Sequence, residues 1–230
     1  MYNHLKTIGL EKYLDEYFCH RTWKCESHLE KLDLFVASKS EEQKAILKDK
    51  FQINKTHRQL NDHFNEIKVA CAYHPLAIFL KEDRELSPDL LDNSLKIEIK
   101  TINESGDEAE RHENMEPDKG YVYFGTRLTE KEEADTKVKV SHSVENKCLY
   151  HLNKATEQIE NNGRIYLIYD WDILFKQDQD SRIHSPLTKN DIKNILESTS
   201  NNFCKNYSNI SIKVVSMEEL KNDVENNSNY

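Results

Sequence analysis

This sequence lacks three features that would place it in a membrane or in an oxidising compartment. No run of about 18 apolar residues occurs in its 230 residues, so we expect no membrane-spanning helix. The first ten residues contain His4 and Lys6 and have no apolar core of the kind found in signal peptides. The five cysteines are odd in number and show no paired spacing, which favours reduced thiols over a disulfide framework. These absences predict a cytoplasmic protein without a membrane partner.

The sequence also lacks an excess of positive charge. Its 32 Lys and Arg and 41 Asp and Glu give a net charge of −9, whereas a protein that binds nucleic acid by overall charge alone would be basic. The balance is uneven: residues 1–60 hold 11 basic and 9 acidic residues, and residues 101–136 hold 4 and 11. The overall charge therefore neither predicts a nucleic-acid partner nor excludes one, and the acidity is concentrated in one segment.

The length of 230 residues is enough for one or two domains with a sizeable core. Of these residues, 37% are hydrophobic and 32% are charged, as in a folded protein with a well-solvated surface. Hydrophobic periodicity predicts helices over residues 3–20 and 26–37, and a third that begins at Ser40, where Gln43 has capping-box spacing. We expect an N-terminal helical region at residues 1–54. A second domain is expected at residues 55–230, with an acidic insertion at about 103–147.

A helix and a short strand are predicted at the start of the second domain. Residues 56–73 carry an apolar stripe at helical spacing, and Glu66 lies at the edge of this stripe, where a solvated carboxylate is usual. Pro75 ends the helix. Residues 76–80 are an apolar run between helix breakers, which predicts a buried strand. The stripe consists of Leu60, Phe64, Ile67 and Cys71.

The remainder of the domain predicts an α/β sheet. Residues 137–142 alternate between apolar and polar and favour a hairpin strand. A helix over 148–161, with Gly163 in C-cap position, precedes a continuously apolar strand at 165–169 that we expect to be covered on both faces. This order predicts at least one crossover. Further elements are expected near 188–203 (helix), at 210–215 (strand) and from 217 (helix), the last with Ser216 and Glu219 in capping-box spacing.

The segment from Ser87 to Lys100 combines charged groups with a strand pattern. Residues 95–100 alternate, so Glu98 and Lys100 share one face of a strand, which by itself is typical of a half-solvated sheet. If Asp89 lies on a neighbouring strand, two carboxylates and one ammonium group converge. Two carboxylates can hold a hard divalent cation, and a nearby amine can orient or deprotonate a water molecule.

The order of these features resembles the core of the PD-(D/E)XK nuclease superfamily, which has the restriction-endonuclease-like fold. The pattern is a helix with Glu66, a strand at 76–80, Pro88-Asp89 on the next strand and Glu98-Ile99-Lys100 on the third. The resemblance covers roughly residues 55–170, including the later helix and buried strand. It implies an α/β fold with a mixed central sheet flanked by helices, to which an N-terminal helical segment is added.

The resemblance also implies roles for individual residues. Asp89 and Glu98, with the carbonyl of Ile99, would bind Mg²⁺ or Mn²⁺. Lys100 would position or activate the attacking water, and Glu66 would reach the metal through water or support a second ion. The implied function is a metal-dependent nuclease, expected to be a DNA endonuclease. Because many members act as dimers, the resemblance is compatible with a homodimer.

Several alternatives stay open at the level of sequence. Asp92 could take the place of Asp89, although Pro88 directly before Asp89 favours the latter. Lys154 and Gln158, one turn apart, point to solvent on a helical wheel. A catalytically inactive member of the same fold would serve as a nucleic-acid- or protein-binding module. The net charge also permits an acidic mimic of nucleic acid or an unrelated α/β protein.

Overall fold

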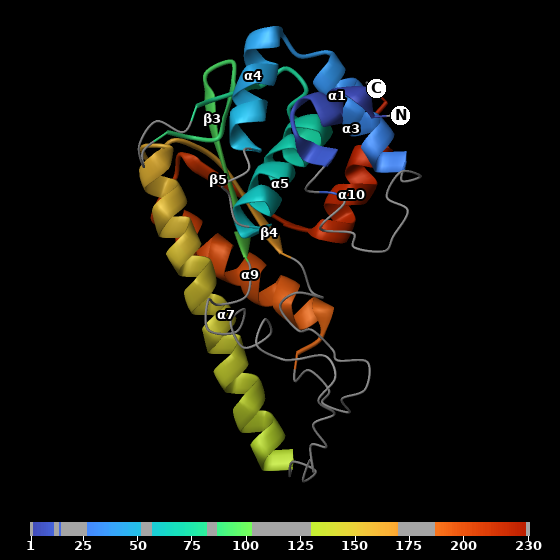
Figure 1. Cartoon of the computed structure of the whole chain (residues 1–230). Coiled ribbons are helices and arrows are strands. Elements are labelled where there is room, and N and C mark those ends of the chain that lie inside the picture. The colour runs from blue at the N-terminus through green and yellow to red at the C-terminus, as the bar shows by residue number, and fades with distance from the viewer. Residues whose placement is uncertain are drawn as a thin grey trace, which may run out of the picture.

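The computed structural model contains a five-stranded sheet flanked by helices (Figure 1). It describes residues 2–11, 14, 27–51, 57–81, 87–102, 130–169 and 187–228. Predictions for residues 15–20 and 103–129 lie outside this range. The helix predicted over residues 3–20 is interrupted, because α1 ends at Thr7 and Gly9 has a φ of 87°. The elements are α1 (Asn3–Thr7), α3 (Ser27–Ala37), α4 (Glu41–Lys50), α5 (His57–Tyr73), β1 (Ile78–Phe79), β2 (Leu90–Asp92), β3 (Leu95–Ile102), α7 (Glu130–Gln158), β4 (Gly163–Tyr169), α9 (Lys189–Cys204), β5 (Ile210–Ser216) and α10 (Met217–Glu225).

The sheet has the order β1-β2-β3-β4-β5 and combines two pairing directions. β1, β2 and β3 pair antiparallel, whereas β3, β4 and β5 pair parallel. Parallel neighbours need a crossover connection, and the chain passes through α7 between β3 and β4 and through α9 between β4 and β5. The predicted α/β class, with a mixed sheet flanked by helices and at least one crossover, is confirmed.

A separate hydrophobic core covers each face of the sheet. Strand residues alternate between the two cores, as the two-residue period of a strand requires. One core joins Ile97 and Ile99 of β3 to α1, α3, α4, α5 and α10, and the other joins Ile102 of β3 to α7 and α9. The first core contains residues from the expected N-terminal region, 1–54, and from the rest of the chain. The N-terminal helices and the sheet therefore bury one another's apolar side chains.

Side-chain caps fix the starts of three helices. Ser216 and Glu219 form the predicted capping box of α10, and Thr188 and Asp191 form another at α9. Ser40 caps α4 by accepting a hydrogen bond from the backbone N–H of Gln43, as its spacing predicts. Each such cap satisfies backbone donors that the first turn leaves without intrahelical partners, and is worth about 1 kcal/mol.

The strand predicted at residues 76–80 is shorter and less buried than expected. β1 consists of Ile78 and Phe79 at the edge of the sheet, and the side chains of Leu76 and Ile78 are 83% and 44% exposed. The prediction was wrong because an apolar run does not reveal whether its strand is central or at an edge. The side chain of Gln43 pairs with both backbone groups of Phe79, at 2.5 and 3.2 Å, and so anchors this edge strand to α4.

Residues 137–142 are helical, which contradicts the predicted hairpin strand. They lie within the 29-residue helix α7, which begins at Glu130 rather than near Cys148. Val140, Val144 and Cys148 are spaced four residues apart and extend the apolar stripe of α7 towards its N-terminus. Packing of this stripe favours a helix over the strand that the short alternation predicted. Figure 1 shows α7 extending well beyond the sheet. Among the described residues, no helix is both long enough and apolar enough to cross a membrane.

Gly163 begins β4 and does not cap the helix, contrary to prediction. Glu160 and Asn161 adopt the left-handed backbone conformation after α7, with φ of 53° and 59°. A Cβ atom on Gly163 would lie 2.3 Å from the carbonyl oxygen of Lys96 on β3. Glycine is therefore required at this position because two strands approach closely.

Candidate functional site

The candidate site lies where β2 separates from β3. The ladder between these strands runs from Asp92 opposite Leu95 to Leu90 opposite Ile97 and stops there. Beyond the end of this ladder, side-chain hydrogen bonds connect the two strands. The carboxylate of Asp89 accepts a hydrogen bond from the backbone N–H of Ile99 at 2.8 Å, and Glu98 accepts one from the backbone N–H of Asp89 at 3.2 Å. Two carboxylates are thus brought together at the end of a strand pair.

Glu98 and Lys100 share a face of β3, as their spacing predicts. Thr101, on the opposite face, accepts a hydrogen bond from Asn65 of α5 at 3.0 Å. Alternation then directs Glu98 and Lys100 to the side that α7 and α9 cover, where Ile102 is also buried. The expectation that this polar face is half-solvated is wrong for Glu98, whose exposure is 0%. A buried carboxylate requires compensating partners.

Lys100 supplies the compensating charge for Glu98. Its Nζ lies 2.5 Å from Oε1 of Glu98. Burial alone would lower the pKa of Lys100, but Glu98, Asp89 and Asp62 outweigh it and raise the pKa above its ordinary value. Lys100 is therefore protonated in the arrangement seen here.

Glu66 is buried, unlike the usual carboxylate at the edge of an apolar stripe. Its two oxygens bind Lys50 Nζ at 2.7 Å and His63 Nδ1 at 2.8 Å. Burial alone would raise the pKa of Glu66, but Lys50 and His63 oppose it and lower the pKa to about 2. The helical wheel places Glu66 at the edge of the apolar stripe but does not show its burial, because Lys50 reaches it from the end of α4.

Lys50 is a residue of the site that sequence reasoning missed. It belongs to α4, outside the segment that resembles a known core, and is buried. A signal was present, because Lys50 follows the buried Ile46 by four residues and Leu47 by three and so lies on the apolar side of its helix. A lysine in such a position needs a buried acid as a partner.

Acidic groups outnumber the ammonium groups in this cluster. Burial, followed by the charge of Glu66, raises the pKa of Asp89 from 3.8 to about 6, although Lys50 and Lys100 oppose the shift. Burial, followed by the charge of Asp89, raises the pKa of Glu98 well above its ordinary value. In the described residues, Lys50 and Lys100 are the ammonium groups that act on Glu66, Asp89 and Glu98, and the ionised carboxylates repel one another. An added cation at this point would relieve that repulsion.

The donors fit a hard divalent ion. Asp89, Glu98 and the backbone carbonyl of Ile99 offer oxygen ligands, and Mg²⁺ is usually held by one or two carboxylates together with water and substrate oxygens. Within the described part of the chain, no three His, Cys, Asp or Glu side chains form a ready-made metal cage. The cluster is therefore suited to an ion that keeps several waters, and not to a closed structural site.

Asp92 lies apart from the cluster. It occupies the other end of β2, where its carboxylate binds Nδ1 of His74 at 2.8 Å, and Nε2 of the same ring binds the hydroxyl of Tyr166 at 2.8 Å. The structure thus brings Asp89 next to Glu98 and uses Asp92 to connect the end of α5 to β4.

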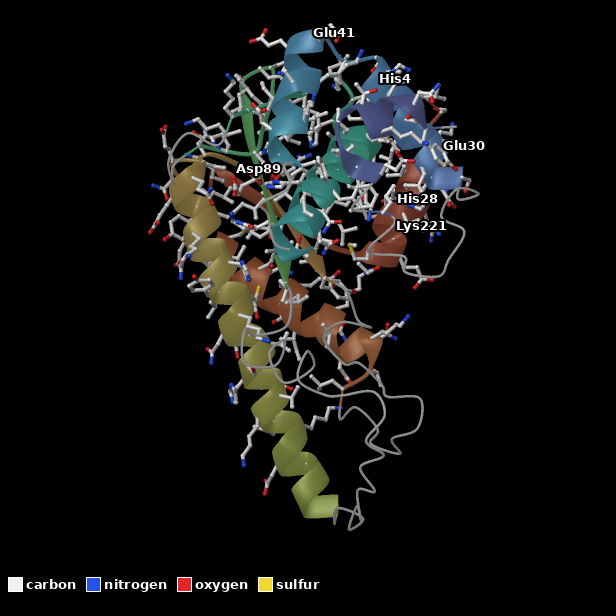
Figure 2. All side chains as sticks on the ribbon, viewed as in Figure 1. His4, His28, Glu30, Glu41, Asp89 and Lys221 are labelled. Carbon is white, nitrogen blue, oxygen red and sulfur yellow. The ribbon has the colours of Figure 1, made fainter. Side chains whose placement is uncertain are left out.

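Of the two polar residues on the later helix, one reaches towards the site. Lys154 is exposed, as predicted, and its Nζ lies 4.6 Å from the ring centre of Tyr150. Gln158 is only partly exposed, contrary to prediction, because its Nε2 donates to the carbonyl oxygen of Ser87 at 3.4 Å. Figure 2 shows Asp89 next to this end of α7.

Comparison of the chain with protein-family models, with curated proteins and with solved structures gives no match.

Proposed function

We propose that this chain is a metal-dependent nuclease with a restriction-endonuclease-like core, acting on phosphodiester bonds of DNA. The observation that supports the proposal most strongly is the meeting of Asp89, Glu98 and Lys100 where β2 leaves β3. Glu66 adds to it, because its charge acts on both acids from α5. The order helix, strand, strand, strand, helix, strand also agrees with the core that the sequence resembles.

The proposed substrate makes definite demands on the site. A phosphodiester is an anion that repels hydroxide, and its transition state gathers negative charge on the non-bridging oxygens. A bound Mg²⁺ or Mn²⁺ would polarise the phosphoryl group and lower the pKa of a coordinated water. Asp89, Glu98 and the carbonyl of Ile99 are the groups that would hold it. The site must also provide a positive group for the phosphate, since its own carboxylates repel the substrate.

Lys100 meets this last requirement. Because it is protonated next to Glu98, it can donate hydrogen bonds to a phosphate oxygen or to the attacking water and offset charge that develops during the reaction. Acting as a base would require it to lose a proton that Glu98 and Asp89 stabilise. We therefore assign Lys100 an electrostatic and orienting role. Glu66 is held by Lys50 and His63, and its charge acts on Asp89.

Cleavage of supercoiled plasmid tests the proposal. The protein should convert it to nicked or linear forms with Mg²⁺ or Mn²⁺ and not with EDTA. Asp89→Asn, Glu98→Gln and Lys100→Met should each lower the rate by about 10²-fold or more, the cost of losing one preorganised electrostatic group in other enzymes. Retained activity in any of the three variants would contradict the role given to that residue.

Lys96 offers a matched control for Lys100. It lies on the same strand and on the same face of β3 as Lys100, but it pairs at 2.5 Å with Glu160, an exposed residue outside the cluster. Lys96→Met and Glu160→Gln remove the same types of charge outside the cluster and should leave cleavage within a few-fold of the parent protein. Loss of activity in these controls would attribute the effect to overall charge or stability and not to the site.

A non-catalytic member of the same fold is a second candidate, and one observation favours it. The ion pairs Lys100–Glu98 and Lys50–Glu66 each compensate a buried carboxylate without a metal ion. A binding module could retain such pairs as part of its core. Calorimetric titration with Mn²⁺ separates the candidates, since the nuclease requires heat of binding that Glu98→Gln abolishes, and the module predicts none.

A further inference from the structure

The outward side of α7 carries three lysines that lead towards the candidate site. Lys139, Lys147 and Lys154 are separated by eight and seven residues, so they lie within about 80° of one another around the helix. The opposite side of the helix is the buried one, with Val144, Cys148 and Leu152. Lys139 and Lys154 are exposed, and Lys147 is partly exposed. The side of α7 that carries these lysines is therefore accessible to solvent over about four helical turns.

The local charge between Lys139 and Lys154 is positive. Residues 139–154 contain three lysines and one acid, Glu145, in a chain whose net charge is −9. Glu145 lies on another flank of the helix and pairs with His142 at 3.5 Å. Lys137, just before the stretch, is turned to α9, where it pairs with Asp191 at 3.3 Å. The three lysines thus form a local positive strip, which the exposed acids Asp135 and Glu157 bound at its two ends.

An aromatic ring lies among these lysines. Tyr150 is 54% exposed, and Lys154 Nζ is placed over its face. The ring borders a shallow surface hollow that the strip lines, together with polar side chains. An exposed ring next to ammonium groups is the combination with which proteins bind single-stranded nucleic acid, because bases stack on the ring and phosphates pair with the lysines. The hollow is lined by Lys139, His142, Ser143, Asn146, Lys147 and Tyr150.

The strip ends at the candidate site. Gln158 follows Lys154 by one helical turn and donates a hydrogen bond to the carbonyl oxygen of Ser87, two residues before Asp89. From Lys139 to Gln158 the helix rises roughly 28 Å, which is room for several nucleotides. Glu98 and Lys100 lie on the face of the sheet that α7 covers, whereas the three lysines lie on the outward side of that helix. A strand that follows the lysines would therefore reach the cluster at the C-terminal end of α7, where Gln158 binds Ser87.

We propose that this side of α7 binds the phosphate backbone of a single nucleic-acid strand and guides it to the cluster of Asp89, Glu98 and Lys100. The proposal rests on the proposed function and specifies its substrate, which is an unpaired strand or a strand end. Tyr150 decides between single strand and duplex, because its ring can stack only on a base that is not enclosed in a double helix. The lysines contribute the sequence-independent attraction.

Fluorescence anisotropy with a labelled single strand of about 20 nucleotides, in EDTA, measures this binding apart from cleavage. The triple variant Lys139→Gln/Lys147→Gln/Lys154→Gln should weaken binding at least tenfold. It should also reduce the slope of log K against log salt by about 2, since each lost phosphate contact removes about 0.7 for a single strand. Tyr150→Ala should weaken single-strand binding about fivefold or more and leave duplex binding unchanged.

The matched control removes three exposed lysines elsewhere, from α4 and from the two ends of α9: Lys48→Gln/Lys189→Gln/Lys205→Gln. Because it changes the net charge equally, it should weaken binding less than threefold. Equal losses in both triple variants, or no binding by the parent protein, would overturn the proposal. Stronger binding of a duplex, or of an acidic peptide, than of the single strand would overturn it as well.

The two proposals fail in different ways. If the parent protein binds the single strand through α7 but cleaves nothing with Mg²⁺ or Mn²⁺, the guiding strip stands and the nuclease assignment fails. If it cleaves single strands and the α7 triple variant keeps the parent KM and affinity, the nuclease assignment stands and the strip is overturned. A higher KM with an unchanged kcat in the triple variant supports both.

Discussion

Replacing Asp89 by asparagine should stabilise the metal-free protein above about pH 6 while removing its response to divalent ions. The carboxylate is held among Glu98, Glu66 and buried backbone, and its pKa is raised from 3.8 to about 6. At about 1.4 kcal/mol per pKa unit, this difference makes the ionised form cost roughly 3 kcal/mol in the folded state. Asparagine keeps the size of the side chain and an oxygen for the N–H of Ile99, but it carries no charge.

The sign of the pH dependence follows from the order of the two pKa values. As the pH rises, the unfolded chain loses this proton near 3.8 and the folded protein only near 6, so the folded state binds more protons in between. Wild-type stability therefore falls as the pH rises through this window. The asparagine variant does not titrate there, and its advantage should grow by roughly 2 kcal/mol between about pH 4.5 and about pH 7.5.

Urea unfolding followed by circular dichroism, in EDTA at both pH values, measures this difference. Adding Mn²⁺ at about 100 times its Kd should then stabilise the wild type by about 2.7 kcal/mol at the higher pH and leave Asp89→Asn unchanged. Asp92→Asn is the control, because Asp92 binds His74 outside the cluster and its variant should keep the Mn²⁺ response. A variant that is less stable than wild type by the same amount at both pH values would refute the reasoning.

Two further predictions concern the surroundings of the site. Lys50→Met leaves the buried Glu66 without its ammonium partner and should destabilise the protein by about 3–5 kcal/mol, and adding Glu66→Gln should restore part of this loss in the same urea assay. An effect below about 1 kcal/mol would mean that water reaches Glu66. Gly163→Ala places a Cβ 2.3 Å from the carbonyl oxygen of Lys96 and should cost about 1–3 kcal/mol, with Asn162→Ala as the neutral neighbour. An unchanged melting temperature would show that β3 and β4 can separate there without loss.

Sequence reasoning was most successful where period and spacing alone decide the outcome. The helices α3, α4, α5, α9 and α10 and the strands β4 and β5 agree with their predicted positions, because each carries a clear apolar pattern or a capping pair. Glu98 and Lys100 share a face because residues 95–102 form a regular strand, in which side chains alternate. The proximity of Asp89 to Glu98 needed one more condition, namely that the two strands be adjacent.

Failures occurred where the outcome depends on what packs against a segment. Residues 137–142 alternate like a strand, but Val140 and Val144 are placed to bury against the same partners as Cys148, and the helix continues through them. The burial of Glu66 could not be read from a helical wheel, because its partner Lys50 belongs to another helix. Lys50 was overlooked because its partner is distant in sequence and belongs to another helix. These residues are decided by tertiary contacts and not by local pattern.

The most direct test of the central claim is a crystal structure with Mn²⁺, with the anomalous signal of the metal measured. Our account predicts a peak that touches the carboxylates of Asp89 and Glu98 and the carbonyl oxygen of Ile99, and that disappears in Glu98→Gln crystals treated in the same way. Crystals in which Mn²⁺ binds elsewhere, or in which the ion pair of Lys100 with Glu98 persists without any peak between Asp89 and Glu98, would contradict it.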